Sequence, residues 1–321
     1  MNNNINQNQS NLNFINNFDI NKFKVSNLQL EKILTYHYDA VQYVQLLKNG
    51  NIISCSIDYL IKIYNPFTSQ IENTLKYGKN PINYIHQLKN GKITFCSYKS
   101  IFILNNNSYD IFQLIEFAHE GSIYKVKELN NLNLISISQD GFIKIWKLIN
   151  NYYEIINEIK ENGPINDVLE FKENIIIFDN NREKKLIIFY LNLNQKIKII
   201  SNENIFNYAL FNFIKLNDNN ILYSGNYIMI TIDINSYEII NESRILGINS
   251  TIFKLCDNNF LIGNRSGDCN QIKFDEKKND MKLISDKSKI HDESVYCFIV
   301  LKNKRIVSCS YDGTIKIWKE K

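Results

Sequence analysis

Short alternations of apolar and polar residues run along most of this chain with a period of two residues. The segment 142–146 reads Phe-Ile-Lys-Ile-Trp, and 314–318 reads Thr-Ile-Lys-Ile-Trp. A period of two predicts β-strands that pack one face against apolar neighbours. The chain also contains 19 Tyr and 19 Phe with abundant Ile, which are side chains that favour strands. These features predict an all-β protein.

Nearly the same nine-residue phrase occurs three times, at 56–64, 138–146 and 310–318. Each copy reads as a strand end, a tight turn and an alternating strand that closes on an aromatic residue. A His lies 21 residues before the Asp of each copy, and the aromatic residue lies six after it. The three sets are His37, Asp58 and Tyr64; His119, Asp140 and Trp146; and His291, Asp312 and Trp318. A unit that recurs in this way indicates a repeat architecture.

These residues and spacings resemble the WD40 repeat family, in which about 40–45 residues form one four-stranded blade of a β-propeller. A second marker counts the repeats: an apolar or small residue six positions before an apolar residue. The pairs are Val41/Leu47, Ile82/Leu88, Ile123/Leu129, Ile165/Phe171, Leu210/Leu216, Asn249/Leu255 and Val295/Leu301. Their mean spacing of about 42 residues fits one blade. The resemblance therefore implies a seven-bladed propeller, although repeats four to six lack the His-Asp-Trp signature.

The two ends of the chain are expected to meet. Residues 28–35 alternate like a strand, and the sequence stops three residues after Trp318. In WD40 relatives the first strand completes the last blade, and the same closure is predicted here because it leaves no sheet edge unpaired. We expect one propeller domain over residues 26–321.

Residues 1–25 form an Asn- and Gln-rich segment that is predicted to be a disordered tail. Its apolar residues could dock either on the propeller itself or on a partner, and the sequence leaves both alternatives open. They are Phe14, Ile15, Phe18, Ile20 and Phe23.

The resemblance assigns a structural role to the repeated His, Asp and aromatic residues. In the family they form a hydrogen-bonded chain with a Ser or Thr inside the blade, which here is Ser136 or Ser138 and Ser308 or Ser310. Ser, His and Asp also form hydrolase triads, but a triad occurs once in an enzyme and not once per repeat. Four His without paired spacing indicate no metal site. No catalytic residue, metal or cofactor is predicted, and His86 is expected to be a packed or edge residue.

Cysteine usage and charge set the remaining limits. Cys55, Cys96 and Cys309 share one strand position, but packed sheets lie about 10 Å apart, which is too far for a disulfide. Six Cys without C-x-x-C or a secretory segment predict a cytoplasmic protein, with the nucleus not excluded. A net charge of +4 with no long basic cluster gives no nucleic-acid signal, and no apolar stretch is long enough to cross a membrane. About one residue in six is Asn, a bias that we attribute to A/T-rich codons.

WD40 propellers mostly serve as binding platforms, and the resemblance implies a peptide site on the face around the central channel. The site is made by the residue after the first marker in each repeat and by the residue before each signature Asp. We call these the rim residues: Gln42, Asn83, Tyr124, Asn166, Phe211, Ser250, Tyr296, Ile57, Gln139 and Tyr311. A looser alignment adds Asn226 and Arg265. Aromatic rim residues either anchor a ligand or fill the channel.

The resemblance implies a non-enzymatic scaffold or adaptor that binds partner proteins or peptides. One alternative is a propeller enzyme with a small-molecule or metal site in the central channel. Another is a mainly structural subunit of a large complex, with repeats four to six as a contact surface or as products of drift.

Overall fold

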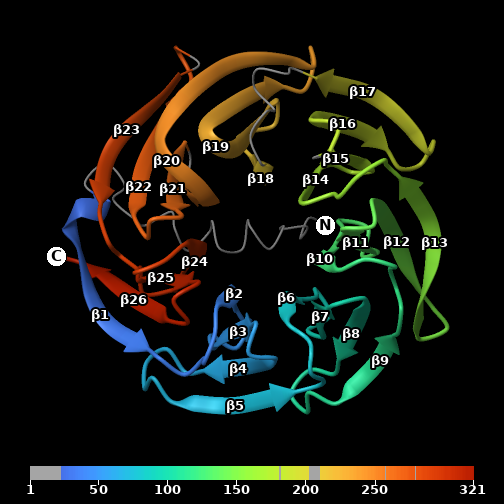
Figure 1. The fold of residues 1–321 in the computed structure, drawn as a ribbon, viewed down its shortest axis with the longest axis horizontal. Helices are drawn as coiled ribbons and strands as arrows, with labels where there is room; N and C mark the ends of the chain where they lie inside the picture. Colours follow the sequence, from blue (N-terminus) through green and yellow to red (C-terminus); the bar gives the residue numbers. More distant parts are fainter. Residues whose placement is uncertain (1–22, 181, 202–209, 257, 279) are drawn as a thin grey trace, which may run out of the picture. The chain divides into compact units, whose positions relative to one another are not determined.

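A computed structural model describes residues 23–180, 182–201, 210–256, 258–278 and 280–321, except for the side chains of residues 210, 211, 226, 245 and 246. These ranges contain 26 strands and one short 3-10 helix, η1 (Val25–Asn27) (Figure 1). No helix in them is long and apolar enough to cross a membrane. Four of the apolar tail residues with two possible docking sites lie outside the described residues: Phe14, Ile15, Phe18 and Ile20.

The described chain divides into two compact units. Unit 1 combines the residues up to Lys76 with those from Leu246 onward, and unit 2 is Tyr77–Ile245. The strands of unit 1 are β1 (Leu28–Leu34), β2 (Val41–Leu46), β3 (Ile52–Ser56), β4 (Leu60–Tyr64), β5 (Ile71–Lys76), β21 (Asn259–Asn264), β22 (Cys269–Asp275), β23 (Asp280–Lys287), β24 (Val295–Val300), β25 (Ile306–Ser310) and β26 (Ile315–Glu320).

The strands of unit 2 are β6 (Ile82–Gln87), β7 (Ile93–Ser97), β8 (Ser100–Leu104), β9 (Ile111–Ile115), β10 (Ile123–Glu128), β11 (Leu134–Ser138), β12 (Phe142–Ile149), β13 (Tyr152–Lys160), β14 (Val168–Lys172), β15 (Ile175–Asn180), β16 (Lys185–Tyr190), β17 (Gln195–Ser201), β18 (Leu210–Lys215) and β19 (Asn220–Asp233). The boundary between the two units falls within the 19-residue strand β20 (Glu238–Cys256).

The strands form antiparallel blades in chain order, as the repeat predicts. Unit 1 holds the sheets β2-β3-β4-β5 and β1-β26-β25-β24, and unit 2 holds β6–β9, β10–β13 and β14–β17 as four-stranded sheets. The two remaining blades are continuous through β19 and β20. In these, β18 pairs with residues 221–225 of β19, while β21 pairs with residues 249–256 of β20. The described residues thus form an all-β, seven-bladed propeller fold.

The last blade contains the first strand of the chain. β1 lies beside β26 (Figure 1), with Leu28 opposite Glu320 and Leu34 opposite Ile315. Arg305 Nη2 donates to Glu31 Oε1 at 2.7 Å and ties β1 to the loop before β25. This pairing is the closure by an N-terminal strand that the sequence predicts.

The residues that directly precede β1 also pack against unit 1. The Val25 N–H donates to Gln271 Oε1 at 3.1 Å, and Gln271 Nε2 donates to the carbonyl of Phe23 at 3.1 Å. Phe23 and Val25 are both buried, in an apolar cluster that includes Trp318. The tail was expected to extend to about residue 25, whereas the packed part of the chain has already begun at Phe23.

We expect closure of the last blade to depend on Leu34, which is 1% exposed and packs with Val41 and Ile315. Leu34→Ala should lower the free energy of unfolding by about 2–5 kcal/mol, because it leaves a cavity between two sheets. Equilibrium urea denaturation measures this loss. Ile33→Ala is the matched control, since Ile33 is 46% exposed and should change stability by less than about 1 kcal/mol. Equal losses would contradict the packing of β1.

Candidate functional site

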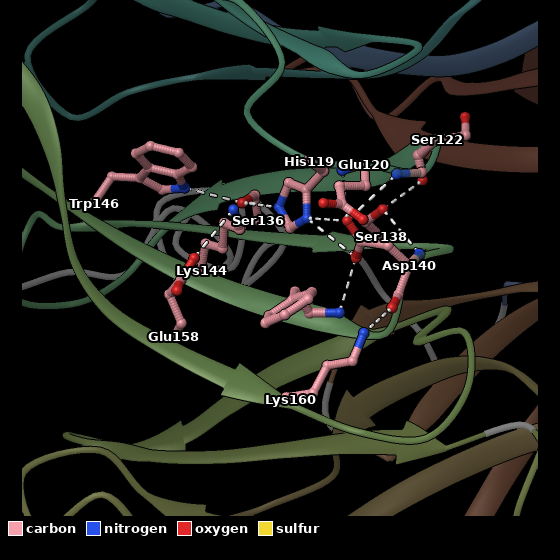
Figure 2. A network of polar contacts seen from close by, with 12 residues as sticks. His119, Glu120, Ser122, Ser136, Ser138, Asp140, Lys144, Trp146, Glu158 and Lys160 are labelled. Carbon is pink, nitrogen blue, oxygen red and sulfur yellow. Dashed lines mark hydrogen bonds and ion pairs between the residues drawn. The ribbon is translucent and has the colours of Figure 1, made fainter.

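The third blade contains a continuous chain of hydrogen bonds between buried side chains (Figure 2). His119 lies before β10, Ser136 on β11 and Trp146 on β12. His119 Nε2 lies 2.7 Å from Ser136 Oγ, and Trp146 Nε1 donates to the same oxygen at 2.9 Å. His119 Nδ1 lies 3.1 Å from Asp140 Oδ2. The antiparallel register brings these four residues together from two strands, β11 and β12, and from two loops.

The protonation states of Asp140 and His119 in this chain of hydrogen bonds follow from burial and hydrogen bonding. Burial opposes ionisation of Asp140, but hydrogen bonds from His119 and from the backbone N–H groups of Phe142 and Glu120 hold its pKa well below the usual range. Burial also lowers the pKa of His119, although Asp140 opposes this. A neutral His119 then donates from Nδ1 to Asp140 and accepts at Nε2 from the Ser136 hydroxyl, which itself accepts from Trp146.

The order Asp–His–Ser matches a catalytic triad, but the hydroxyl is not accessible. Ser136 has no exposed surface, and its hydroxyl is hydrogen-bonded to both His119 and Trp146. A nucleophilic serine must reach a substrate carbonyl. The third blade therefore uses these residues to hold its strands and turns together.

The seventh and first blades contain the same chain of hydrogen bonds, with one difference in the first blade. In the seventh, Ser308 lies 2.7 Å from His291 Nε2 and accepts from Trp318 Nε1 at 2.9 Å. In the first, Ser54 lies 2.7 Å from His37 Nε2, but its contact with the Tyr64 hydroxyl is long, at 3.4 Å. Asp58 and Asp312 lie 2.7 and 2.9 Å from Nδ1 of their His.

The structure also decides between the paired serine alternatives. Ser138 Oγ donates to the carbonyl of Ser122 at 3.0 Å, and Ser310 Oγ donates to the carbonyl of Glu293 at 3.2 Å. These hydroxyls hold loop backbone in place. Ser136 and Ser308 are the residues that join the buried chains.

Most rim residues lie at an irregularity that recurs from blade to blade. The register of the innermost strand jumps by one residue, from Val41 to Tyr43 in β2 and from Val295 to Cys297 in β24. A β-bulge of this kind leaves one residue outside the ladder and redirects its side chain. The residues skipped in this way are Gln42, Asn83, Tyr124, Phe211, Ser250 and Tyr296. Asn166 differs, because it precedes β14.

Three polar rim residues bind other parts of their own unit. Asn83 Nδ2 donates to the carbonyl of Ile123 at 2.7 Å, and Ser250 Oγ donates to the carbonyl of Val295 at 2.6 Å. Asn166 Nδ2 donates to Asp179 Oδ2 at 2.9 Å. These side chains have a structural role whatever they bind.

The aromatic rim residues of unit 1 are arranged differently. Tyr296 and Tyr311 meet edge to face, with ring centroids 6.1 Å apart and an interplanar angle of 89°. Tyr311 is 49% exposed and Tyr296 is partly buried. Arg265 acts on the pKa of Tyr296 and therefore lies in the same neighbourhood. An exposed aromatic pair beside a cation suits contact with another molecule.

The other rim residues vary in exposure. Gln139 is exposed, whereas Gln42, Ile57 and Tyr124 are partly buried. The side chain of Phe211 lies outside the described residues.

Sequence reasoning missed two buried carboxylates of the fourth blade. Asp179 Oδ1 accepts from the N–H groups of Asn166 and Asp167 at 2.8 and 2.9 Å, and burial raises the pKa of Asp179 to about 6. Asp167 Oδ1 lies 2.8 Å from Lys125 Nζ. A signal was present in the sequence, since Asp179 interrupts an apolar strand that begins Ile-Ile-Ile-Phe.

The cysteines pack in a way that their spacing did not show. Cys309 lies opposite Cys297 on the neighbouring strand, a residue that the sequence comparison left out. All six Cys are free thiols, and burial raises the pKa of Cys96 to about 12 and that of Cys309 well above its usual value. Such thiols are poor nucleophiles. Among the described residues, no three His, Cys, Asp or Glu side chains are placed to hold a metal ion.

Comparison with known proteins supports the assignment of the last repeat and the fold. Residues 287–319 match the family model "WD domain, G-beta repeat". A crystal structure of the WD40 β-propeller domain of Doa1 superposes with a TM-score of 0.73 at 15% identity, covering 92% of this chain and 98% of that chain. No curated protein sequence matches the chain. At this identity the similarity to Doa1 establishes the fold alone.

The buried imidazoles predict a dependence of stability on pH. Burial lowers the pKa of both His119 and His291, whereas an unfolded His titrates near about 6.5. Below that pH the unfolded chain binds more protons, so the free energy of unfolding should fall from pH 7 to pH 5, by up to about 1.4 kcal/mol per pH unit for each His. Urea denaturation at several pH values measures the slope. His119→Asn should make it shallower, and an unchanged slope would mean that His119 binds protons equally in the folded and unfolded protein.

In each chain of hydrogen bonds, the central serine hydroxyl should contribute more to the free energy of unfolding than the polar group of the aromatic residue at the end. Ser136→Ala removes the partner of both His119 and Trp146, so we expect a loss of about 2 kcal/mol or more in urea denaturation. Tyr64→Phe removes only the 3.4 Å contact with Ser54 and should cost less than about 1 kcal/mol. The reverse order would contradict the geometry described here.

Proposed function

This chain is a β-propeller with WD40-type repeats, and from that premise we propose that it is a non-enzymatic scaffold or adaptor. It binds partner proteins or peptides through rim residues on the face of its blades. WD40 propellers generally mediate interactions between proteins, which supports the proposal.

The observation that carries the proposal is the Tyr296–Tyr311 pair. Tyr296 is held at a β-bulge and meets Tyr311 edge to face, and Tyr311 is 49% exposed. Two ordered aromatic side chains offer a large contact area at low entropic cost, which is typical of residues that dominate protein interfaces. The nearby Arg265 adds a hydrogen-bond donor for a backbone carbonyl or a carboxylate. We propose these three residues as the centre of the binding surface in unit 1.

An enzymatic function has less support from the described residues. The repeated Ser, His and Asp are consumed by the buried chains, and the rim residues include no Asp, Glu or His. General acid–base chemistry requires such groups at the site. A structural role in a large complex is consistent with the same surfaces. Whether the protein is a scaffold or a structural subunit, we expect it to act in the cytoplasm. We also expect residues 26–321 to act as one domain.

Affinity capture of the tagged protein from its own cells, with quantitative mass spectrometry, tests the proposal. The double variant Tyr296→Ala/Tyr311→Ala should retain at least about tenfold less of each specific partner, because it removes two aromatic anchors. Phe67→Ala is the matched control, since Phe67 is 65% exposed in the loop between β4 and β5, away from the rim residues. Equal retention by both variants would contradict this binding surface, provided that both melt like the wild-type protein.

A further inference from the structure

Three basic side chains lie together on the two innermost strands β6 and β10 of unit 2. Lys125 and Lys127 are two residues apart on β10 and therefore share a face. His86 lies on β6, and the charge of Lys127 acts on its pKa. Lys127 Nζ is also 6.0 Å from the ring of Tyr84, which shares the face of His86. We call Lys125, Lys127 and His86 the Lys–His cluster.

The cluster is enclosed by protein and still open to water. The side chains of Lys125 and Lys127 are 19% and 30% exposed, and His86 is partly exposed. Even so, burial lowers the pKa of Lys127 and, with the charges of Lys127 and Lys89, brings that of His86 to about 4. Partial exposure with strong desolvation describes a concave wall, where an ion interacts more strongly than on an open surface.

The hydrogen bonds of the cluster leave donors unused. Asp167 Oδ1 lies 2.8 Å from Lys125 Nζ but 3.4 Å from Lys127 Nζ, whose other partner is the carbonyl of Val168 at 3.2 Å. Asp167 is occupied further by the N–H groups of Val168 and Phe213, at 2.8 and 3.0 Å. Within the described ranges, the His86 ring makes no hydrogen bond. Lys127 and His86 can therefore turn N–H groups toward an incoming acceptor.

The local charge favours an acceptor with a single negative charge. Lys125 and Lys127 contact one carboxylate, Asp167, so the Lys–His cluster has an excess of about one positive charge when Asp179 is neutral. Such an excess is neutralised by one carboxylate, whereas a phosphate brings up to two charges. Two rim residues lie on the same strands: Tyr124 directly precedes Lys125 on β10, and Asn83 lies three residues before His86 on β6. A peptide bound at the rim would thus present its side chains nearby.

We propose that the Lys–His cluster binds the carboxylate of an acidic side chain from a protein partner, with Lys127 as its main ligand. This inference rests on the proposed function, since it names the chemistry of the bound segment: an Asp- or Glu-containing peptide. Lys125 holds Asp167, and His86 donates a second hydrogen bond once the anion favours its protonated form.

Binding strengthens as the pH falls. Burial raises the pKa of Asp179 to about 6, so near pH 5.5 this group loses its charge while a peptide carboxylate remains ionised. The groups that face Asp179 are Asp167, Asn166, Tyr124 and Tyr223, and Lys125 and Lys127 reach it through Asp167. The pKa of Asp167 is lowered and those of both tyrosines are raised, so these three groups do not titrate between pH 5.5 and 7.5.

The experiment compares two blocked peptides, Gly-Glu-Glu-Gly and Gly-Gln-Gln-Gly, on the full chain. Proton NMR follows His86, which is one of only four His and is assigned with His86→Asn. The Glu peptide should raise the pKa of His86, saturate at lower concentration at pH 5.5 than at pH 7.5, and bind at least about tenfold more tightly than the Gln peptide. A purely structural Lys127 would produce none of these effects.

Charge variants complete the test. Lys127→Met should weaken binding of the Glu peptide by about tenfold, and Lys127→Arg should restore it to within about threefold. Lys198→Met is the control, because Lys198 is an exposed residue of β17 in the same unit. Each variant is first shown to melt like the wild-type protein, and Lys127→Arg covers the case in which Lys127→Met does not fold.

The contrary outcomes are distinct. Equal affinity for the two peptides, or equal effects of Lys127→Met and Lys198→Met, would overturn the inference. Inorganic phosphate that binds more tightly than the Glu peptide would also overturn it, by assigning the cluster to a free anion. The proposed function fails separately: Tyr296→Ala/Tyr311→Ala changes residues of unit 1, so retained partner capture by that variant leaves the peptide result intact.

Discussion

A four-stranded sheet cannot bury both of its faces alone, and the rest of this structure depends on that constraint. The second strand of a blade, such as β3 or β25, is buried along its whole length. Its neighbours therefore have to supply apolar surface on both sides. In unit 1, Val41 and Ile52 of one sheet pack with Ile315 and Ile317 of the next. In unit 2, Ile143 and Phe178 join two sheets in the same way. This packing explains why Ile and aromatic residues recur even where the polar signature is lost.

Packing between sheets fixes the strands, and bulges then release single residues from them. The register jump at Gln42, Tyr124 or Tyr296 removes one residue from the ladder while those on either side stay paired. The released side chain takes a direction that a regular strand would not allow. Some of these residues bind neighbouring backbone, as Asn83 and Ser250 do, and others, such as Tyr296, contact exposed aromatic groups. The same backbone device thus places residues that bind neighbouring backbone and residues that we propose for partner binding.

The sequence was sufficient for features that depend on period and spacing. Alternation predicted the strands, the His-Asp-Trp spacing predicted three blades with buried chains, and residues 28–35 predicted the closing strand. Features that depend on register were out of reach. Ser136 and Ser138 both point inward from the same strand, and only the pairing with β10 and β12 decides which one meets His119. Cys297 lies opposite Cys309 because of a bulge, and a bulge has no clear signature in one sequence. The Lys–His cluster combines residues about 40 positions apart that no motif connects.

The repeats that lack the His-Asp-Trp signature indicate the role of the buried chain of hydrogen bonds in the other blades. In the fourth blade, Asp179 accepts from the backbone of Asn166 and Asp167, which ties the loop before β14 to the end of β15. In the sixth, Asn264 accepts from the N–H groups of Ser266 and Asp268, and Asp268 accepts from the N–H of Lys289. Each blade must satisfy the polar groups of these turns, because buried groups without partners are costly. Carboxylates and amides meet that requirement where His and Trp are absent. They also change the electrostatics, since burial raises the pKa of Asp179 to about 6, whereas burial lowers the pKa of His119 and His291.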